Sequence, residues 1–217
     1  MLPHAEYAIP HHDAIKDQAV AYMKELHGWC SEEKASILID LILKMRPQVI
    51  VEIGVFGGKS LVPMAYALKA NKTGKIYGID PWSTEASVEG IMKDDILHFW
   101  SWIDHESILQ DLKGKIEEFA LSDQIELIRS TSEDAGLIQD IDILHIDGNH
   151  SDAASYLDAT KWVPQVVSGG LIIFDDIDWT ENDSNPTFRA VKWMNEHCVS
   201  FAEFTENGET WGIWIKP

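Results

Sequence analysis

The sequence predicts an α/β fold built on a doubly wound, mostly parallel sheet of seven strands that ends in an antiparallel hairpin. Short β-branched runs alternate with helical patterns along most of the chain, and a glycine-rich turn follows the first of these runs. The last two runs flank an Asn-Gly pair, which is typical of a hairpin turn. These observations indicate a Rossmann-like sheet, and 217 residues, 45% of them hydrophobic, suit a single domain over residues 1–217.

The first part of the chain, residues 1–46, is expected to be helical. Ser31 followed by acidic residues offers a hydroxyl N-cap, and apolar residues then recur at helical spacing until Pro47 closes the helix. The β-branched run 49–53 comes next and predicts a buried parallel strand. A glycine turn and a helical stretch from about 60 to 69 follow this strand, which is how a doubly wound sheet begins.

The remaining strands are predicted from similar runs. They lie at 75–79, 124–128, 141–146 and 169–174, with helical segments between them, notably 152–167. The final hairpin pairs 201–205 with 210–215 around the turn at 206–209, which contains Asn207. Parallel strands followed by an antiparallel hairpin narrow the choice of fold considerably.

The segment from 84 to 122 is too long for an ordinary connection between a strand and a helix. It has a helical pattern of its own, in which Phe99, Trp100 and Trp102 are prominent. We therefore expect a helical cap insertion over the crevice at the end of the sheet. With Trp179, its aromatic residues suggest a pocket for a planar ring, although the same rings serve equally well to pack a helix on the core.

Composition limits the partners and the compartment. The 36 acidic and 17 basic residues give a formal net charge of −19, which would repel a phosphate backbone or an anionic membrane, so we expect neither nucleic acid nor membrane as a partner. Cys30 and Cys198 lack C-x-x-C spacing, and neither a secretory leader nor an apolar run of about 20 residues is evident. These features favour a soluble cytoplasmic protein without disulfides that acts on a small molecule. A homo-oligomer is left open.

Acidic residues stand directly after two of the predicted strands. Asp147 follows the strand at 141–146, and Asp175 and Asp176 follow the strand at 169–174. Ligands bind beyond the carboxyl ends of parallel strands, so the three acids are expected to converge on one crevice, unless Asp147 and Asp176 merely cap the next helix or turn. Crowded carboxylates raise one another's pKa, and three oxygen donors are typical of a hard-cation site. We therefore predict a divalent metal, with Mg²⁺ favoured over Mn²⁺ or Ca²⁺.

The turn after the first strand, from Glu52 to Ser60, fits neither of the common phosphate motifs. Its glycine spacing is not that of a dinucleotide fingerprint, and its loop is too short for a P-loop. A carboxylate beside the turn opposes a pyrophosphate but favours a cofactor with an amino group or a sulfonium. Asp80, directly after the second strand, is placed to accept both ribose hydroxyls, or is simply a turn residue before Pro81.

The whole pattern, from about Gly28 to the hairpin, resembles the class I S-adenosylmethionine-dependent methyltransferases. Within them it resembles the metal-dependent O-methyltransferases of the catechol type, together with the macrocin O-methyltransferase and cephalosporin hydroxylase-like group. The resemblance implies that the E-x-G-x-x-x-G-x-S turn holds the methionine part of S-adenosylmethionine, that the acid after the second strand holds the ribose, and that the segment after the third strand meets the adenine edge. The implied cofactor residues are Glu52, Gly54, Gly58, Ser60, Asp80, Trp82, Ser132 and Glu133. For Ser132 a helix N-cap is an equally good interpretation.

The same resemblance assigns the metal ligands and the base. Asp147, Asp175 and Asp176 match, in order, the metal ligands of the catechol-type enzymes. His150 stands where those enzymes have a lysine, whereas macrocin-type relatives resemble this sequence in having a histidine. An unperturbed pKa of about 6.5 suits a general base near neutrality, so we expect His150 and Asp147 to be catalytic; a surface histidine at a helix start is the alternative. His145, inside a strand, is better explained as a hydrogen-bonded core imidazole.

These features predict an S-adenosylmethionine-dependent O-methyltransferase that acts, with a divalent metal, on a hydroxyl of a small molecule such as a vicinal diol, a catechol or a sugar. Two alternatives keep the fold. A cephalosporin hydroxylase-like oxygenase would normally use two histidines and one carboxylate, which three aspartates do not match. A catalytically silent cofactor-binding protein would need Glu52, Gly54 and Asp80 but not the acids after the fourth and fifth strands.

Overall fold

A computed structural model describes residues 12–90, 93–181, 183–206 and 208–217. Two points of the sequence analysis fall outside these residues: the expected absence of a secretory leader at the N-terminus, and Asn207 in the hairpin turn. Among the described residues, none of the helices has the length and apolar character needed to cross a membrane. Cys30 and Cys198 are both free thiols.

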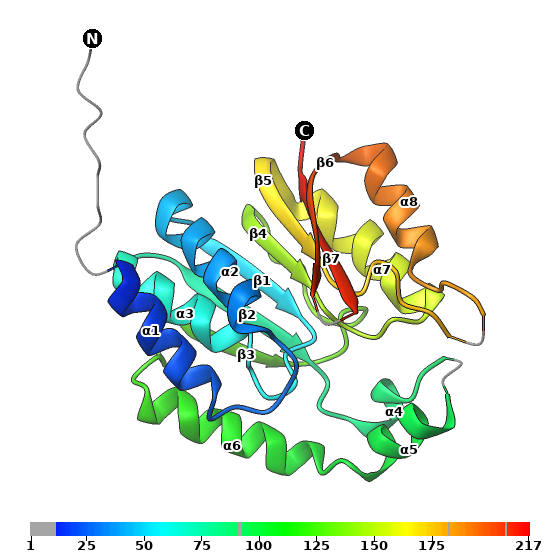
Figure 1. The fold of residues 1–217 in the computed structure, drawn as a ribbon, viewed down its shortest axis with the longest axis horizontal. Coiled ribbons are helices and arrows are strands. Elements are labelled where there is room, and N and C mark those ends of the chain that lie inside the picture. The colour runs from blue at the N-terminus through cyan, green and yellow to red at the C-terminus, as the bar shows by residue number, and fades with distance from the viewer. Residues whose placement is uncertain (1–11, 91–92, 182, 207) are drawn as a thin grey trace.

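The strands form one seven-stranded sheet in the order β3-β2-β1-β4-β5-β7-β6 (Figure 1). Strands β1 to β5 run parallel, and β7 lies antiparallel to both β5 and β6. The strands are β1 Val49–Ile53, β2 Lys75–Asp80, β3 Ile125–Arg129, β4 Ile141–Ile146, β5 Val166–Phe174, β6 Val199–Glu206 and β7 Glu209–Ile215. This topology confirms the predicted fold class. The winding reverses between β1 and β4, which places a crevice at the carboxyl ends of these strands.

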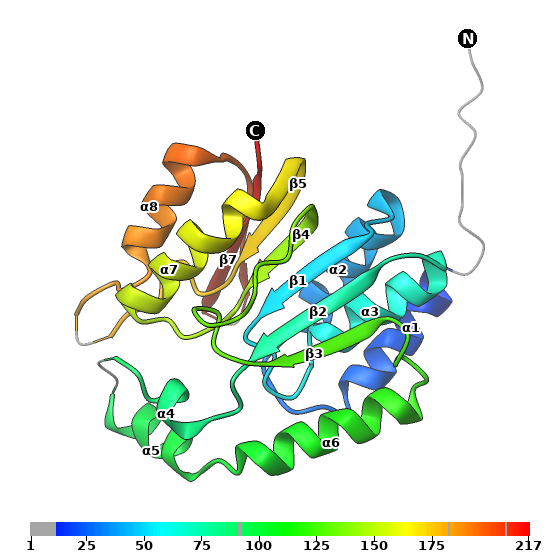
Figure 2. The ribbon, with the colours of Figure 1, turned by 180° about the vertical axis from the view of Figure 1, so that it is seen from behind.

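Helices cover both faces of the sheet. α1, α2, α3 and α6 pack on one face, and α7 and α8 pack on the other (Figures 1 and 2). The helices are α1 His12–Met23, α2 Glu32–Met45, α3 Leu61–Asn71, α4 Thr84–Ser87, α5 Asp94–Trp102, α6 His105–Glu118, α7 Asp152–Trp162 and α8 Phe188–His197, with a 3-10 turn at Val163–Gln165. Neighbouring strand residues serve opposite layers: Ile50 belongs to the first and Val51 to the second. The sheet therefore divides the core into two halves.

Helix α2 begins and ends where the sequence predicts. The Ser31 hydroxyl oxygen accepts a hydrogen bond from the Lys34 backbone N–H at 2.8 Å, which caps the first turn. At the other end, Arg46 adopts the left-handed conformation and its N–H donates to the carbonyl oxygen of Ile42 at 2.9 Å, immediately before Pro47. The N-cap fixes the turn that carries the Lys34 side chain, which becomes important in the site.

The segment 84–122, predicted as a single cap, consists of two different parts. α4 and α5 lie beyond the carboxyl ends of the strands and stand off from the sheet (Figure 2). α6 instead buries Leu109, Leu112 and Ile116 in the core, at the i, i+3, i+7 spacing of an amphipathic helix. Within this part of the described chain, α4 and α5 therefore have the position of a cap, and α6 is the ordinary crossover helix between β2 and β3.

Candidate active site

A cavity of about 550 Å³ lies at the carboxyl ends of the central strands. The predicted site residues that line it are Gly54 and Ser60 after β1, Asp80 at the end of β2, Ser132 after β3, Asp147 and His150 after β4, and Asp175 and Asp176 after β5. Glu52, Gly58, Trp82 and Glu133 do not belong to this lining. The structure thus brings every predicted catalytic and metal residue, and four of the eight predicted cofactor residues, to one crevice.

Strand register explains why the acids meet. β1, β4 and β5 are neighbours in the sheet, and Ile53 pairs with Ile146, which pairs in turn with Phe174. Asp147 N–H donates to the carbonyl oxygen of Ile53 at 2.8 Å, and Asp175 N–H donates to that of Ile146 at 3.0 Å, so the pairing continues one residue beyond the strands. Asp147 and Asp175 therefore leave adjacent strands at nearly the same level.

Gly54 allows the turn after β1 to approach the loop after β4 closely. Its φ is +84°, in the left-handed region. A Cβ atom at this position would lie 1.9 Å from the backbone oxygen of Asp147. No larger residue fits here, so the glycine is required for Asp147 to sit beside the turn.

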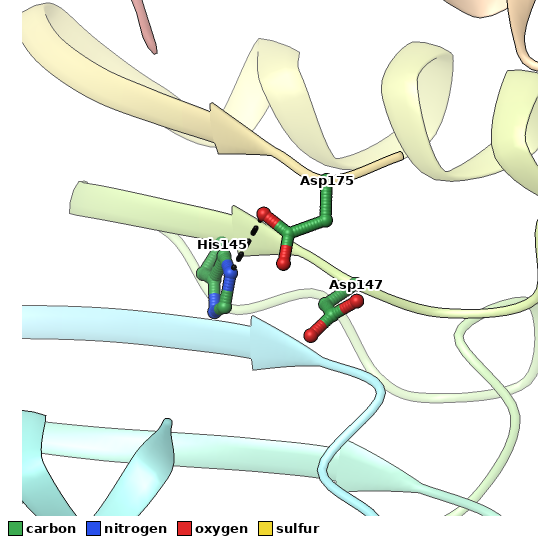
Figure 3. Close-up of side chains that lie close together, drawn as sticks. All are labelled: His145, Asp147 and Asp175. Carbon is green, nitrogen blue, oxygen red and sulfur yellow. Dashed lines mark ion pairs between the residues drawn. The ribbon is translucent and has the colours of Figure 1, made fainter. Parts of the chain in front are cut away.

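Five polar side chains form what we call the buried polar chain: Ser60, Glu52, His145, Lys34 and Asp175. The Ser60 hydroxyl donates to Glu52 Oε1 at 2.5 Å, and the same oxygen contacts His145 Nδ1 at 2.8 Å. His145 Nε2 lies 3.1 Å from Lys34 Nζ and 3.4 Å from Asp175 Oδ1 (Figure 3), and Lys34 Nζ forms an ion pair with Asp175 Oδ2. His145 is fully buried, which confirms its expected role as a hydrogen-bonded core imidazole.

Lys34 balances the charge of the buried polar chain. Burial raises the pKa of Asp175, but the Lys34 ammonium and His145 outweigh burial and hold that pKa well below its usual range. Burial lowers the pKa of Lys34, yet the carboxylates of Asp175 and Asp147 outweigh it and hold that pKa above its usual range. Lys34 and Asp175 are thus both charged, and Asp175 already has a cation supplied by the protein itself.

A second group, which we call the open trio, consists of Asp147, His150 and Asp176. Their potential ligand atoms all lie within 4.8 Å of one another, and His150 Nε2 is 3.1 Å from Asp176 Oδ2. All three residues line the cavity, and Trp179 packs beside the imidazole of His150 with ring centroids 5.1 Å apart. The open trio is therefore available to a ligand or an ion that enters the cavity.

Asp147 also belongs to a further group with ion-binding geometry. With His145 and Asp175 it offers ligand atoms that lie within 4.8 Å of one another (Figure 3). The two groups together contain all three predicted metal ligands. Burial, and then the Asp175 carboxylate, raise the pKa of Asp147 well above its ordinary value, although Lys34 opposes this. Ionised Asp147 is unfavourable here without another cation, which is the condition in which a divalent ion would bind.

Asp80 holds the turn after β1 in place. One carboxylate oxygen of Asp80 accepts hydrogen bonds from the N–H groups of Val55 and Phe56 at 3.0 and 2.9 Å, and the other accepts from the Trp82 N–H at 2.7 Å. Burial raises the pKa of Asp80 although these bonds favour its ionised form. Trp82 is buried, and its indole N–H donates to the carbonyl oxygen of Phe56 at 2.8 Å, so Trp82 supports the turn from behind.

Sequence reasoning does not find Lys34. Its partners His145 and Asp175 are 111 and 141 residues further along the chain, and only the fold brings them together. One local signal exists, because Lys34 lies in the first turn of α2, where the helix dipole disfavours a cation. A lysine in the first turn of a helix is favoured when another part of the protein binds its ammonium, and acids at the ends of the strands are candidates for that partner.

Aromatic side chains form one wall of the cavity. Trp29, Phe56, Phe99 and Trp100 line it, and the Trp29 ring lies 5.4 Å from that of Phe56 and 5.9 Å from that of Trp100. Trp102, which belongs to the same predicted cap pattern, is 78% exposed and does not line the cavity. The wall suits the planar or apolar part of a small molecule.

Comparison with known protein families gives one clear match. Residues 51–177, more than half of the chain, match a family model described as a methyltransferase domain. This match agrees with the predicted resemblance to methyltransferases. No curated protein matches the chain.

Several solved structures share the fold. The O-methyltransferase NovP is 15% identical, with a TM-score of 0.69 over 96% of this chain and 98% of that one. TomG from Streptomyces achromogenes, an O-methyltransferase of tomaymycin synthesis solved with S-adenosylmethionine, is 14% identical, with a TM-score of 0.62 over 94% and 90%. An O-methyltransferase from Bacillus cereus, in complex with SAH, is 15% identical, with a TM-score of 0.61 over 98% and 94%. At these identities the likeness concerns the fold.

Proposed function

The chain belongs to the methyltransferase domain family, and we propose that it is an S-adenosylmethionine-dependent O-methyltransferase that acts, with a divalent metal ion, on a hydroxyl of a small molecule. The observation that carries this proposal is the single cavity in which Gly54, Asp80 and the open trio meet. NovP and TomG, which share the fold, are O-methyltransferases, and TomG was solved with S-adenosylmethionine. These likenesses support the cofactor and the class of reaction.

The cofactor would bind along the ends of β1, β2 and β3. Gly54 and Ser60 would contact its methionine part, Asp80 its ribose, and Ser132 the region of its base; all four residues line the cavity. Glu52 lies behind the turn as a buried carboxylate, which favours positive charge on the ligand. The other predicted cofactor residues, Gly58, Trp82 and Glu133, do not line the cavity, so they would act only by supporting the residues that do. When bound, the cofactor supplies a methyl group on a sulfonium, which an oxygen nucleophile can displace.

The residues present fit a divalent ion. Burial and then the neighbouring acids raise the pKa of Asp147, and the carboxylate of Asp176 lies within reach of it in the open trio. We propose Asp147, Asp175 and Asp176 as the ligands, with Mg²⁺ favoured because all their donors are oxygens. When bound, such an ion supplies the charge that lowers the pKa of a substrate hydroxyl. Asp175 differs from the other two ligands because Lys34 already balances its charge.

His150 is proposed as the general base, with Asp147 beside it. The His150 Nε2 lies 3.1 Å from Asp176 Oδ2, so the tautomer that donates from Nε2 leaves Nδ1 to accept the proton of a substrate hydroxyl. Asp176 would thereby orient the imidazole. Each group with ion-binding geometry contains one histidine and two carboxylates, the reverse of the usual oxygenase triad, so this arrangement does not favour the hydroxylase alternative.

Calorimetry and a transfer assay test the proposal in two stages. S-adenosylhomocysteine is first titrated into the protein, and we expect saturable binding with and without Mg²⁺. Transfer of a labelled methyl group from S-adenosylmethionine to catechols, vicinal diols and sugars is then measured, and we expect turnover that Mg²⁺ stimulates and EDTA abolishes. Absence of any cofactor binding would refute the methyltransferase proposal, whereas undiminished turnover in EDTA would refute only the metal.

A further inference from the structure

The loop after β4 contains a side chain to which the proposed chemistry gives no role. Asn149 directly precedes the proposed base His150 and lines the cavity. Its Oδ1 accepts a hydrogen bond from the Ser151 N–H at 2.8 Å. Its Nδ2 donates to the carbonyl oxygens of Ala86 and Glu89 at 3.3 and 3.0 Å. Asn149 therefore connects the loop of the proposed base to the segment that carries α4 and α5.

The two ends of the Asn149 amide serve different parts of the fold. An amide turned the other way would set its oxygen against two carbonyl oxygens and its NH₂ against an N–H group, so the partners determine which end faces the cap. The Oδ1 bond belongs to the start of α7, because Ser151 is the N-cap of that helix. The Nδ2 bonds belong to the cap. A substitution that changes one end alone therefore separates the two.

The cap segment, by which we mean the described residues of 83–102, has few other attachments. No residue of α4 or α5 is buried. The Lys93 N–H donates to Glu181 Oε2 at 3.1 Å, and the Lys93 ammonium donates to the carbonyl oxygen of Thr180 at 3.2 Å. The rings of Phe99 and Trp100 pack on the other rings of the aromatic wall. Within the described chain, Asn149 thus provides two of the four hydrogen bonds that join this segment to the rest of the protein.

A close backbone approach at Gly90 joins the cap segment to the same loop. Gly90 has a φ of +97°, and a Cβ atom at this position would lie 2.8 Å from the Cβ of Ser151. A larger residue would be strained here and would push the two segments apart. Asn149 and Ser151, the two chain neighbours of His150, therefore both contact the cap segment.

These contacts fix one dimension of the cavity. The cap segment carries Phe99 and Trp100 of the aromatic wall, whereas the loop after β4 carries His150. A small molecule that binds between them needs the wall and the base at a constant separation. A general base must lie within hydrogen-bond reach of the proton that it removes, and small displacements of the substrate slow a reaction severely.

We propose that Asn149 is a positioning residue whose amide seats the cap segment on the loop of His150 and thereby sets the distance between the aromatic wall and the proposed base. The consequence for catalysis rests on the proposed function, but the seating itself can be measured without turnover. Because only the seated cap completes the wall, loss of the Nδ2 bonds weakens binding of the methyl acceptor more than it slows the chemical step.

Asn149→Asp tests the seating in the ligand-free protein. The aspartate keeps an oxygen that can accept from the Ser151 N–H, but it sets a second oxygen against the carbonyl groups of Ala86 and Glu89. Amide hydrogen exchange is followed with millisecond resolution by mass spectrometry. We expect the amides of α4 and α5 to exchange at least about tenfold faster than in wild type, as loss of these hydrogen bonds predicts. The amides of α7 should exchange as before.

Two further variants serve as a matched control and an independent check. Ser151→Ala removes the hydroxyl that caps α7 by accepting from the Ala154 N–H at 3.2 Å, and it leaves Asn149 in place. We expect faster exchange in the first turn of α7 and unchanged exchange in the cap segment. Gly90→Ala disturbs the same contact from the side of the cap, so it should speed exchange in α5 as Asn149→Asp does.

Transfer of a labelled methyl group to catechol, used as the acceptor probe, distinguishes seating from a general loss of structure. Asn149→Asp should raise KM for catechol at least about fivefold and change kcat by less than about twofold, because saturating acceptor restores the seated cap. A partly unfolded protein would instead lose kcat at unchanged KM, and this result would overturn the inference.

The exchange data separate this inference from the proposed function. If the cap amides of Asn149→Asp exchange as in wild type, or if those of wild type show no protection, the inference is overturned and the proposed function stands. If exchange changes as expected but wild type transfers no methyl group to any acceptor, the seating holds and the result counts against the proposed function. If Asn149→Asp does not fold, Gly90→Ala decides.

Discussion

The buried polar chain and the open trio stand at the ends of the same strands but have different surroundings. The His145 side chain is 0% exposed and connects Glu52 with Asp175, whose charge Lys34 balances. The His150 side chain is 25% exposed, and among the described residues it lies within ion-pair distance of Asp176 alone. Asp175 belongs to the buried polar chain and Asp176 to the open trio. Asp176 has a φ of +51°, so the backbone is left-handed at the point where it passes from one group to the other. Two adjacent strand-end acids therefore have different surroundings: Asp175 is paired with an internal cation, and Asp176 faces the cavity beside His150.

The largest expected effect comes from removing the internal cation. Lys34→Met leaves the Asp175 carboxylate buried without its partner, and we expect the free energy of unfolding to fall by about 3 to 5 kcal/mol, as for other broken buried ion pairs. Urea denaturation at neutral pH measures this loss. Lys24→Met, which removes an exposed pair with Glu32, should cost less than about 1 kcal/mol. If Lys34→Met lost no more unfolding free energy than Lys24→Met, Lys34 and Asp175 would not form a charged buried pair.

A double variant sharpens this result. Lys34→Met combined with Asp175→Asn removes both charges, so it should recover part of the stability lost in Lys34→Met alone. Wild type, the two single variants and the double variant together give the coupling free energy between Lys34 and Asp175. This value excludes the general cost of altering α2. Additive losses would mean that Lys34 and Asp175 do not depend on each other.

The second effect concerns the metal. Asp176→Ala removes a proposed ligand from the open trio, and we expect kcat in Mg²⁺ to fall about a thousandfold, with S-adenosylhomocysteine affinity and stability nearly unchanged. Asp175→Ala should also lose metal-stimulated turnover, but it should be unstable as well, because it leaves Lys34 unpaired. Asp178→Ala, an exposed neighbour that accepts a hydrogen bond from Thr210, is the control. Full turnover by Asp176→Ala would show that Asp176 is not a metal ligand.

These contrasts mark what the sequence can predict. Asp147 and Asp175 follow directly from strand patterns, because a residue just after a parallel strand lies at the ligand-binding edge whatever the rest of the fold does. Lys34 cannot be found in this way, since its partners belong to distant strands. Asp158 is one polar residue in a predicted helix, and only packing shows that it faces a cavity rather than solvent.

The cap illustrates the same limit. Apolar spacing predicts helices in residues 84–122 but does not say what each helix packs against. α6 buries Leu109 and Leu112 in the core, whereas no residue of α5 is buried to that degree. The difference arises because α6 returns along the sheet to begin β3, and α4 and α5 do not contribute to that crossover.

The third effect tests whether His150 of the open trio acts as a general base. His150→Gln should lower kcat about a hundredfold at pH 7, as expected for loss of a general base, and less at pH 9, where the substrate hydroxyl loses its proton more readily. His197→Gln, an exposed imidazole on α8, should change neither rate. Equal losses at both pH values would assign His150 a structural role.

The last comparison is between a buried acid that has a cation beside it and one that does not. The pKa of Asp175 lies below its ordinary value, so this residue stabilises the fold above about pH 4, and that contribution is lost as the pH falls further. The pKa of Asp158 is raised from 3.8 to about 7, so folding opposes its ionisation, and its effect on stability becomes less favourable as the pH rises through this range.

Asparagine substitutions should therefore have opposite signs in the ligand-free protein. Asp158→Asn resembles the protonated acid, and we expect it to be more stable than wild type by at most about 4 kcal/mol at pH 8, with the difference vanishing near pH 4. Asp175→Asn should be less stable than wild type at pH 8, because the Lys34 ammonium loses its partner. Urea denaturation of the three proteins at several pH values measures both differences. If Asp158→Asn were as unstable as Asp175→Asn at pH 8, the protein would have to stabilise the ionised form of Asp158, contrary to its raised pKa.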